Sequence, residues 1–120
     1  MTNHVHLMMS TDGRNRPEAI LRDHKRHTSE QLRAALTKHP GESRREWMLR
    51  EFTAAGTANS NNRGFQLWQQ DSHPIQPYTR EVIYQKLDYT HRNPQTAGFV
   101  FEPEAWAWSS ARDYAGWKDM

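Results

Sequence analysis

An alternating pattern at the start of the chain is the feature that most constrains its fold. Within residues 3–9, the side chains from His4 to Leu7 alternate between polar and apolar. A period of two is typical of a strand, so His4 and His6 share one face and Val5 and Leu7 take the other. Residues 65–69 alternate in the same way and predict a second, short strand.

Three other segments predict helices. Pro17 suits the first turn of one helix, Thr79 is a plausible N-cap for another, and Pro94 is expected to end that helix near Asn93. The predicted helices are residues 17–38, 42–55 and 80–93. A polar loop over residues 56–64 follows the second helix, and the aromatic tail at residues 105–110 is expected to pack over the core.

Composition limits the class of protein. A chain of 120 residues is expected to form one domain, and 35% hydrophobic residues supply one modest core. No apolar run approaches the roughly 20 residues of a membrane span, so we expect no membrane partner. The chain has no cysteine, which excludes thiolate metal sites and favours a cytoplasmic location.

The basic residues hint at a polyanionic partner. The net charge is only +2, but twelve of the sixteen basic residues are arginine, which suits bidentate contact with phosphate. Residues 14–50 hold ten basic and five acidic side chains. This surplus is also compatible with an ordinary solvated surface.

The two histidines of the first predicted strand are candidate metal ligands. Residues i and i+2 of a strand project from the same face, roughly 6.5–7 Å apart along the chain. Imidazoles placed in this way at His4 and His6 can converge on one divalent ion. The alternative is a pair of surface histidines on an edge strand.

A tyrosine and an asparagine on the third predicted helix are the second candidate pair. Tyr89 and Asn93 are four residues apart and so share one helix face. A metal held by two imidazoles and an amide oxygen could polarise a phosphodiester, and a tyrosine beside it could attack phosphorus. Tyr84 is the competing nucleophile, although it points away from the Tyr89 face. Alternatively, Tyr89 is a structural tyrosine near a helix end.

These residues occur in segments that resemble the HUH single-tyrosine transposases of the insertion-sequence and REP-associated type. The resemblance spans nearly the whole chain, and its most specific match surrounds Tyr89. The matching segments are Asn3-His4-Val5-His6-Leu7, residues 21–29, residues 65–75, Lys86-Leu87-Asp88-Tyr89-Thr90-His91-Arg92-Asn93-Pro94 with Ala97-Gly98-Phe99-Val100, and residues 108–114.

The resemblance implies a role for each matched residue. His4, His6 and Asn93 would be the ligands of Mg²⁺ or Mn²⁺, and Tyr89 would be the nucleophile. The implied substrate is single-stranded DNA beside a hairpin, of the REP or insertion-sequence-end kind. The implied reaction is cleavage and rejoining through a 5′-phosphotyrosine. The candidate phosphate contacts are Arg22, Lys25, Arg26 and Lys86. Trp68 is either a core residue or a platform for stacking a base.

The resemblance also implies a fold and a setting. The expected fold is α+β, a ferredoxin-like (RRM-like) antiparallel sheet with helices on one face. Family members carry a strand, a helix and a strand before the His-x-His segment. The chain is therefore expected to be one HUH transposase-like domain, residues 1–120, truncated at its amino terminus. A homodimer, and a bacterial, nucleoid-associated location in the cytoplasm, would fit this setting.

Two other functions use the same residues. In one, the chain is a non-catalytic module that binds hairpin or single-stranded DNA. In the other, His4 and His6 hold a metal that joins two copies of the chain. A larger nickase of the replication-initiator or relaxase kind is disfavoured by the short chain.

Overall fold

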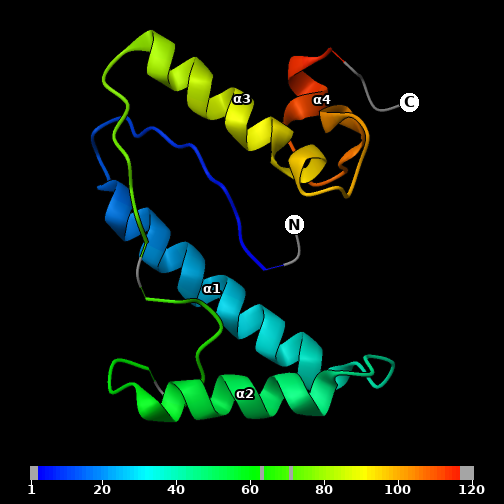
Figure 1. Ribbon diagram of the computed structural model, residues 1–120. Helices are drawn as coiled ribbons and strands as arrows, with labels where there is room; N and C mark the ends of the chain where they lie inside the picture. Colours follow the sequence, from blue (N-terminus) through cyan, green and yellow to red (C-terminus); the bar gives the residue numbers. More distant parts are fainter. Residues whose placement is uncertain (1–2, 63, 71, 117–120) are drawn as a thin grey trace. The chain divides into compact units, whose positions relative to one another are not determined.

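The computed structural model describes residues 3–62, 64–70 and 72–116 (Figure 1). The helices are α1 (Pro17–Lys38), α2 (Arg45–Ala58), α3 (Arg80–Thr96), the short 3₁₀ helix η1 (Pro103–Ala105) and α4 (Ala111–Tyr114). Contacts divide the described residues into two units. We call residues 3–9 with 74–116 the terminal unit, and residues 10–73 the central unit. No helix in the described ranges is both long and apolar enough to cross a membrane.

The described part of the chain contains no β-strand, so the expected ferredoxin-like antiparallel sheet is wrong. Residues 3–9 and 65–69 do run without helix, but they belong to different units and form no ladder with each other. The backbone N–H of Gln66 is instead bonded to the carbonyl of Phe52 in helix α2, at 2.8 Å. Alternation predicts which side chains share a face, but a strand also requires a neighbouring strand for its backbone.

Helix α1 confirms the prediction for residues 17–38. Pro17 occupies the first turn, where its missing N–H removes no helical hydrogen bond. Glu18 in the first turn and Lys38 in the last both complement the helix dipole.

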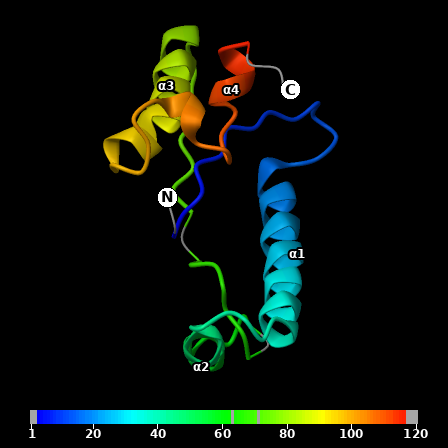
Figure 2. The same ribbon diagram turned by 90° about the vertical axis from the view of Figure 1, so that its right-hand side faces the viewer.

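Helix α2 starts and ends three residues later than predicted. The carbonyl of Glu42 accepts from the N–H of Arg45, and its carboxylate accepts from the N–H of Arg44 at 3.0 Å. Glu42 therefore forms the turn before the helix. The helix crosses the end of α1, as two views show (Figures 1 and 2).

The core of the central unit forms around one aromatic side chain. Phe65 is 9% exposed, and its ring lies 5.6 Å from that of Phe52. The Arg33 guanidinium of α1 covers the same ring at 5.1 Å. Gly56 admits this close approach, because a Cβ there would lie 2.1 Å from the Phe65 nitrogen.

Helix α3 begins as predicted, with the Thr79 hydroxyl accepting from the N–H of Val82. It continues through Pro94 to Thr96, so the predicted end at Asn93 is wrong. Proline in the last turn removes only one backbone hydrogen bond of the helix. Gly98 forms the turn after the helix, where its φ of 78° permits bonds from its N–H to the Gln95 carbonyl and from the N–H of Phe99 to the Pro94 carbonyl.

Polar contacts join the tail of the terminal unit to α3 and join its two short helices, η1 and α4, to each other. The Gln95 amide donates to the carbonyl of Phe101 at 2.6 Å, and the Arg112 guanidinium donates to the carbonyl of Glu104 at 2.7 Å. Ala111 is buried, whereas Trp108 is 88% exposed and does not pack over a core as expected.

Candidate active site

The candidate site lies in the terminal unit, where helix α3 positions its tyrosine. Tyr89 lies in the middle of α3, and Asn93 follows one turn later on the same face. The Thr79 cap and the Gly98 turn fix the two ends of this helix. Tyr89 is 56% exposed, so its hydroxyl is open to a large substrate.

The extended segment 3–9 brings both histidines together. The ring centroids of His4 and His6 are 5.0 Å apart, and the ring planes are nearly perpendicular. The His6 ring also meets the Tyr89 ring edge to face, with centroids 5.5 Å apart. Residues separated by more than eighty positions in the sequence therefore form one cluster.

Asn3 sets the tautomer of His4. The Asn3 side-chain oxygen lies 2.7 Å from His4 Nδ1 and can only accept a hydrogen bond. The proton of a neutral His4 ring is therefore on Nδ1, and the Nε2 lone pair is available to a metal. Asn3 is therefore a further candidate site residue, which the alternating pattern did not single out. The Asn-His dipeptide is the signal that could have found it.

The electrostatics of His6 favour the uncharged ring. Partial desolvation by neighbouring groups, and next the positive charge of a protonated His4, lower the pKa of His6 below its ordinary value of 6.5. A neutral imidazole is the form that binds a metal.

The donor set fits a divalent ion. Two imidazoles that bind one ion at about 2.1 Å have ring centroids roughly 5 Å apart when they approach at about a right angle. The observed separation of His4 and His6 agrees with this value. The third ligand that the resemblance implies, Asn93, lies one turn from Tyr89 on helix α3. Two imidazoles with an oxygen ligand suit Mg²⁺ less well than Mn²⁺. The described residues contain no cluster of three or more His, Cys, Asp or Glu ligands.

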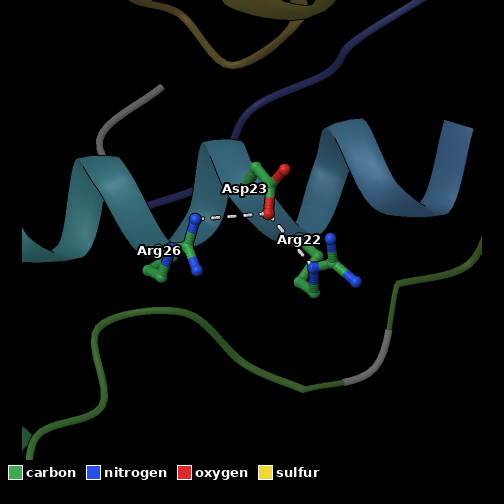
Figure 3. A network of polar contacts seen from close by, with 3 residues as sticks. All are labelled: Arg22, Asp23 and Arg26. Atoms are coloured by element: carbon green, nitrogen blue, oxygen red, sulfur yellow. Dashed lines mark hydrogen bonds and ion pairs between the residues drawn. The ribbon is translucent and has the colours of Figure 1, made fainter. Parts of the chain in front are cut away.

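Three of the four predicted phosphate-binding residues lie in the central unit, on helix α1. The Asp23 carboxylate pairs with Arg22 at 3.1 Å and with Arg26 at 3.5 Å (Figure 3). Exposed pairs of this kind contribute about 0–1 kcal/mol, so a phosphate can replace Asp23. Lys25 instead donates to the Gln69 carbonyl at 3.0 Å and to the Ser72 hydroxyl at 2.8 Å.

Lys86 is the one predicted phosphate contact in the terminal unit, three residues before Tyr89 on α3. The structure thus brings together His4, His6 and Tyr89, and places Lys86 and Asn93 one turn from Tyr89. Tyr84 lies on the same helix, but the ring that meets His6 is that of Tyr89.

No protein-family model, curated protein or solved structure matches this chain. The geometry of the terminal unit therefore carries the functional argument.

Proposed function

We propose that the chain is a metal-dependent transposase that cleaves and rejoins single-stranded, hairpin-flanked DNA through a tyrosine nucleophile. The contact of Tyr89 with His6, at 5.5 Å between ring centroids, is the observation that carries this proposal. It joins the candidate nucleophile to the candidate metal ligands. The resemblance to the HUH single-tyrosine transposases indicates the reaction, because it implies DNA cleavage by a tyrosine beside metal-binding histidines.

The residues have separate roles in this reaction. His4, His6 and Asn93 would hold a divalent ion, Mg²⁺ or Mn²⁺, and the bound ion would supply positive charge that polarises the phosphodiester. The Tyr89 oxygen forms a bond to phosphorus while the bond from phosphorus to the 3′ oxygen breaks. The phenolic proton passes to solvent and the released 3′ oxygen takes one up. Rejoining reverses these changes, so no nucleotide triphosphate is required.

A non-catalytic DNA-binding module is the second candidate, and the exposure of the site favours it. Tyr89 is 56% exposed, and both histidines are exposed as well. Catalytic sites gain from excluding water around the reacting groups, whereas a binding surface does not need to. In the first proposal, the DNA itself covers the site.

Covalent trapping distinguishes the two candidates. The purified chain is mixed with labelled single-stranded hairpin DNA and Mn²⁺ and run on a denaturing gel. We expect an adduct that disappears in Tyr89→Phe and in EDTA, and persists in the matched variant Tyr84→Phe. An adduct of undiminished yield in Tyr89→Phe would contradict the proposed nucleophile. Hairpin binding without any adduct would favour the binding module.

The metal ligands are tested without DNA. Mn²⁺ binding is measured by electron paramagnetic resonance on the wild type, His4→Ala, His6→Ala and the control His27→Ala, which changes a histidine of the central unit. We expect each ligand variant to bind Mn²⁺ at least tenfold more weakly, as loss of a ligand generally causes. Equal binding by all four proteins would remove His4 and His6 from the proposal.

A further inference from the structure

Carboxamides make up half of the residues that line a hollow in the central unit. It lies between helix α1 and the segment that follows α2. Among the residues that the structure describes, the lining contains one cation and no carboxylate. The side chains used in the argument are Lys25, Asn62, Gln66, Trp68, Gln69 and Gln70. A polar, nearly uncharged surface of this kind suits a neutral ligand with both donors and acceptors.

Hydrogen bonds fix the orientation of two of these carboxamides. The side-chain oxygen of Gln66 accepts from the amide of Asn62 at 2.8 Å and from that of Asn59 at 3.2 Å. The Gln66 amide nitrogen is therefore a donor, and the Asn62 oxygen an acceptor, that no bond within the described ranges uses. A donor and an acceptor on neighbouring side chains match the paired groups on the edge of a nucleobase.

An aromatic ring and a cation complete the lining. The Trp68 indole N–H donates to the Thr28 hydroxyl at 2.9 Å, which holds the half-buried ring against α1. Lys25 is held at the same hollow by its bonds to the Gln69 carbonyl and the Ser72 hydroxyl. Aromatic rings stack on bases and ammonium groups bind phosphates in proteins that hold single strands.

We propose that this hollow binds one unpaired base of a single-stranded DNA. Gln66 and Asn62 bond to the edge of the base, Trp68 stacks on its face, and Lys25 contacts the adjoining phosphate. The choice of DNA rests on the proposed function, but the pocket itself does not depend on Tyr89 or on a metal. Adenine is the expected base, because asparagine and glutamine amides pair best with its N6 and N7 atoms.

The test compares the affinities of DNA strands that differ only in the base at one position. Fluorescein-labelled five-residue strands carry four abasic sites and a central A, C, G, T or abasic position. Binding to the full chain carrying Tyr89→Phe is followed by anisotropy in EDTA, so that neither cleavage nor metal contributes. We expect the strand with adenine to bind about tenfold more tightly than the fully abasic strand, the effect of stacking one base. Equal affinity for the five strands, or no binding of any, would overturn the proposal.

Three further substitutions test whether the base-dependent affinity comes from the residues of this hollow. Gln66→Glu keeps the oxygen that Asn59 and Asn62 need but removes the donor, so we expect the preference for adenine to vanish while far-UV circular dichroism stays unchanged. Trp68→Leu should reduce the affinity for every base-containing strand toward that of the abasic strand. Gln31→Ala, which removes an amide from α1 outside the hollow, should leave both properties intact. A base preference that survives Gln66→Glu and Trp68→Leu would overturn the proposal.

The result separates this inference from the proposed function. Base-dependent binding lost in Gln66→Glu, together with no covalent adduct in the trapping assay, would retain the base pocket and reject the catalysis. An adduct at Tyr89 with base-independent binding would retain the catalysis and reject the pocket.

Discussion

The two units of the molecule are stabilised in different ways. The central unit buries the ring of Phe65 between groups from α1 and α2. In the terminal unit, the buried apolar side chains among the described residues are the small ones of Pro94 and Ala111. Its segments are joined instead by helix caps and by side-chain bonds to backbone carbonyls, such as those of Gln95 and Arg112.

This difference indicates which unit can hold a shaped binding hollow and which can hold an open site for a large substrate. A buried ring fixes the elements around it, so the central unit can keep a shaped hollow without a ligand. The terminal unit leaves Val5, Leu7 and Tyr89 exposed, which gives a large substrate access to the candidate site. Loss of apolar packing should therefore lower the stability of the central unit most. Loss of a cap or a polar bond should lower the stability of the terminal unit most.

The largest effect is expected from Phe65→Ala. Removing the buried ring should lower the free energy of unfolding of the central unit by about 3 kcal/mol. Hydrogen exchange followed by mass spectrometry should show lost protection in α1 and α2 and unchanged protection in α3. Equal loss in all three helices would show that the two units unfold together.

Gly56→Ala should have the next largest effect. The new Cβ would meet the backbone of Phe65, so α2 and the following segment must separate. We expect a loss of about 2 kcal/mol in a urea unfolding series. The matched control is Gly41→Ala, where a Cβ meets only the flexible ring of His39 at 3.4 Å, and its midpoint should remain near that of the wild type.

Thr79→Ala tests whether helix caps and polar bonds stabilise the terminal unit. Loss of the cap should destabilise α3 by about 1 kcal/mol. The Glu81 carboxylate accepts hydrogen bonds from the Glu81 backbone N–H and from the Thr79 hydroxyl. These bonds lower the pKa of Glu81 below its ordinary value of 4.5. This contribution is present above pH 4.5 and is lost as the pH falls through the lowered pKa of Glu81. The variant should therefore differ less from the wild type at pH 3 than at pH 7, as measured by exchange protection of α3.

The smallest effect is expected from acidifying the metal-free protein around His6. Because the folded state lowers the pKa of His6, the unfolded chain binds its proton more tightly. Stability should therefore decrease as the pH falls below 6.5, and this decrease should be smaller in His6→Asn. Histidine ring signals in NMR spectra should show His6 titrating below pH 6.5. A titration at or above that pH would contradict the proposed desolvation of the ring.

Sequence periodicity predicted the helices well because helical hydrogen bonds are local. The helix at residues 17–38 and the cap at Thr79 were correct, since each depends on side chains within one or two turns. The predicted sheet was wrong, because strand pairing depends on segments that are distant in the sequence. Residues 3–9 and 65–69 each have a suitable pattern, but neither forms a ladder within the described residues.

The sequence by itself determined the residue types of the candidate site and the helix that carries Tyr89 and Asn93, because one helical turn sets their spacing. Only the tertiary structure decided that His6 lies against Tyr89 and that the Trp68 indole bonds to Thr28 of helix α1. It also decided that Gln66 and Asn62 line one hollow with Trp68. The physical reason is the same in each case. Local hydrogen bonding fixes a helix, whereas contacts between separate segments depend on how the whole unit packs.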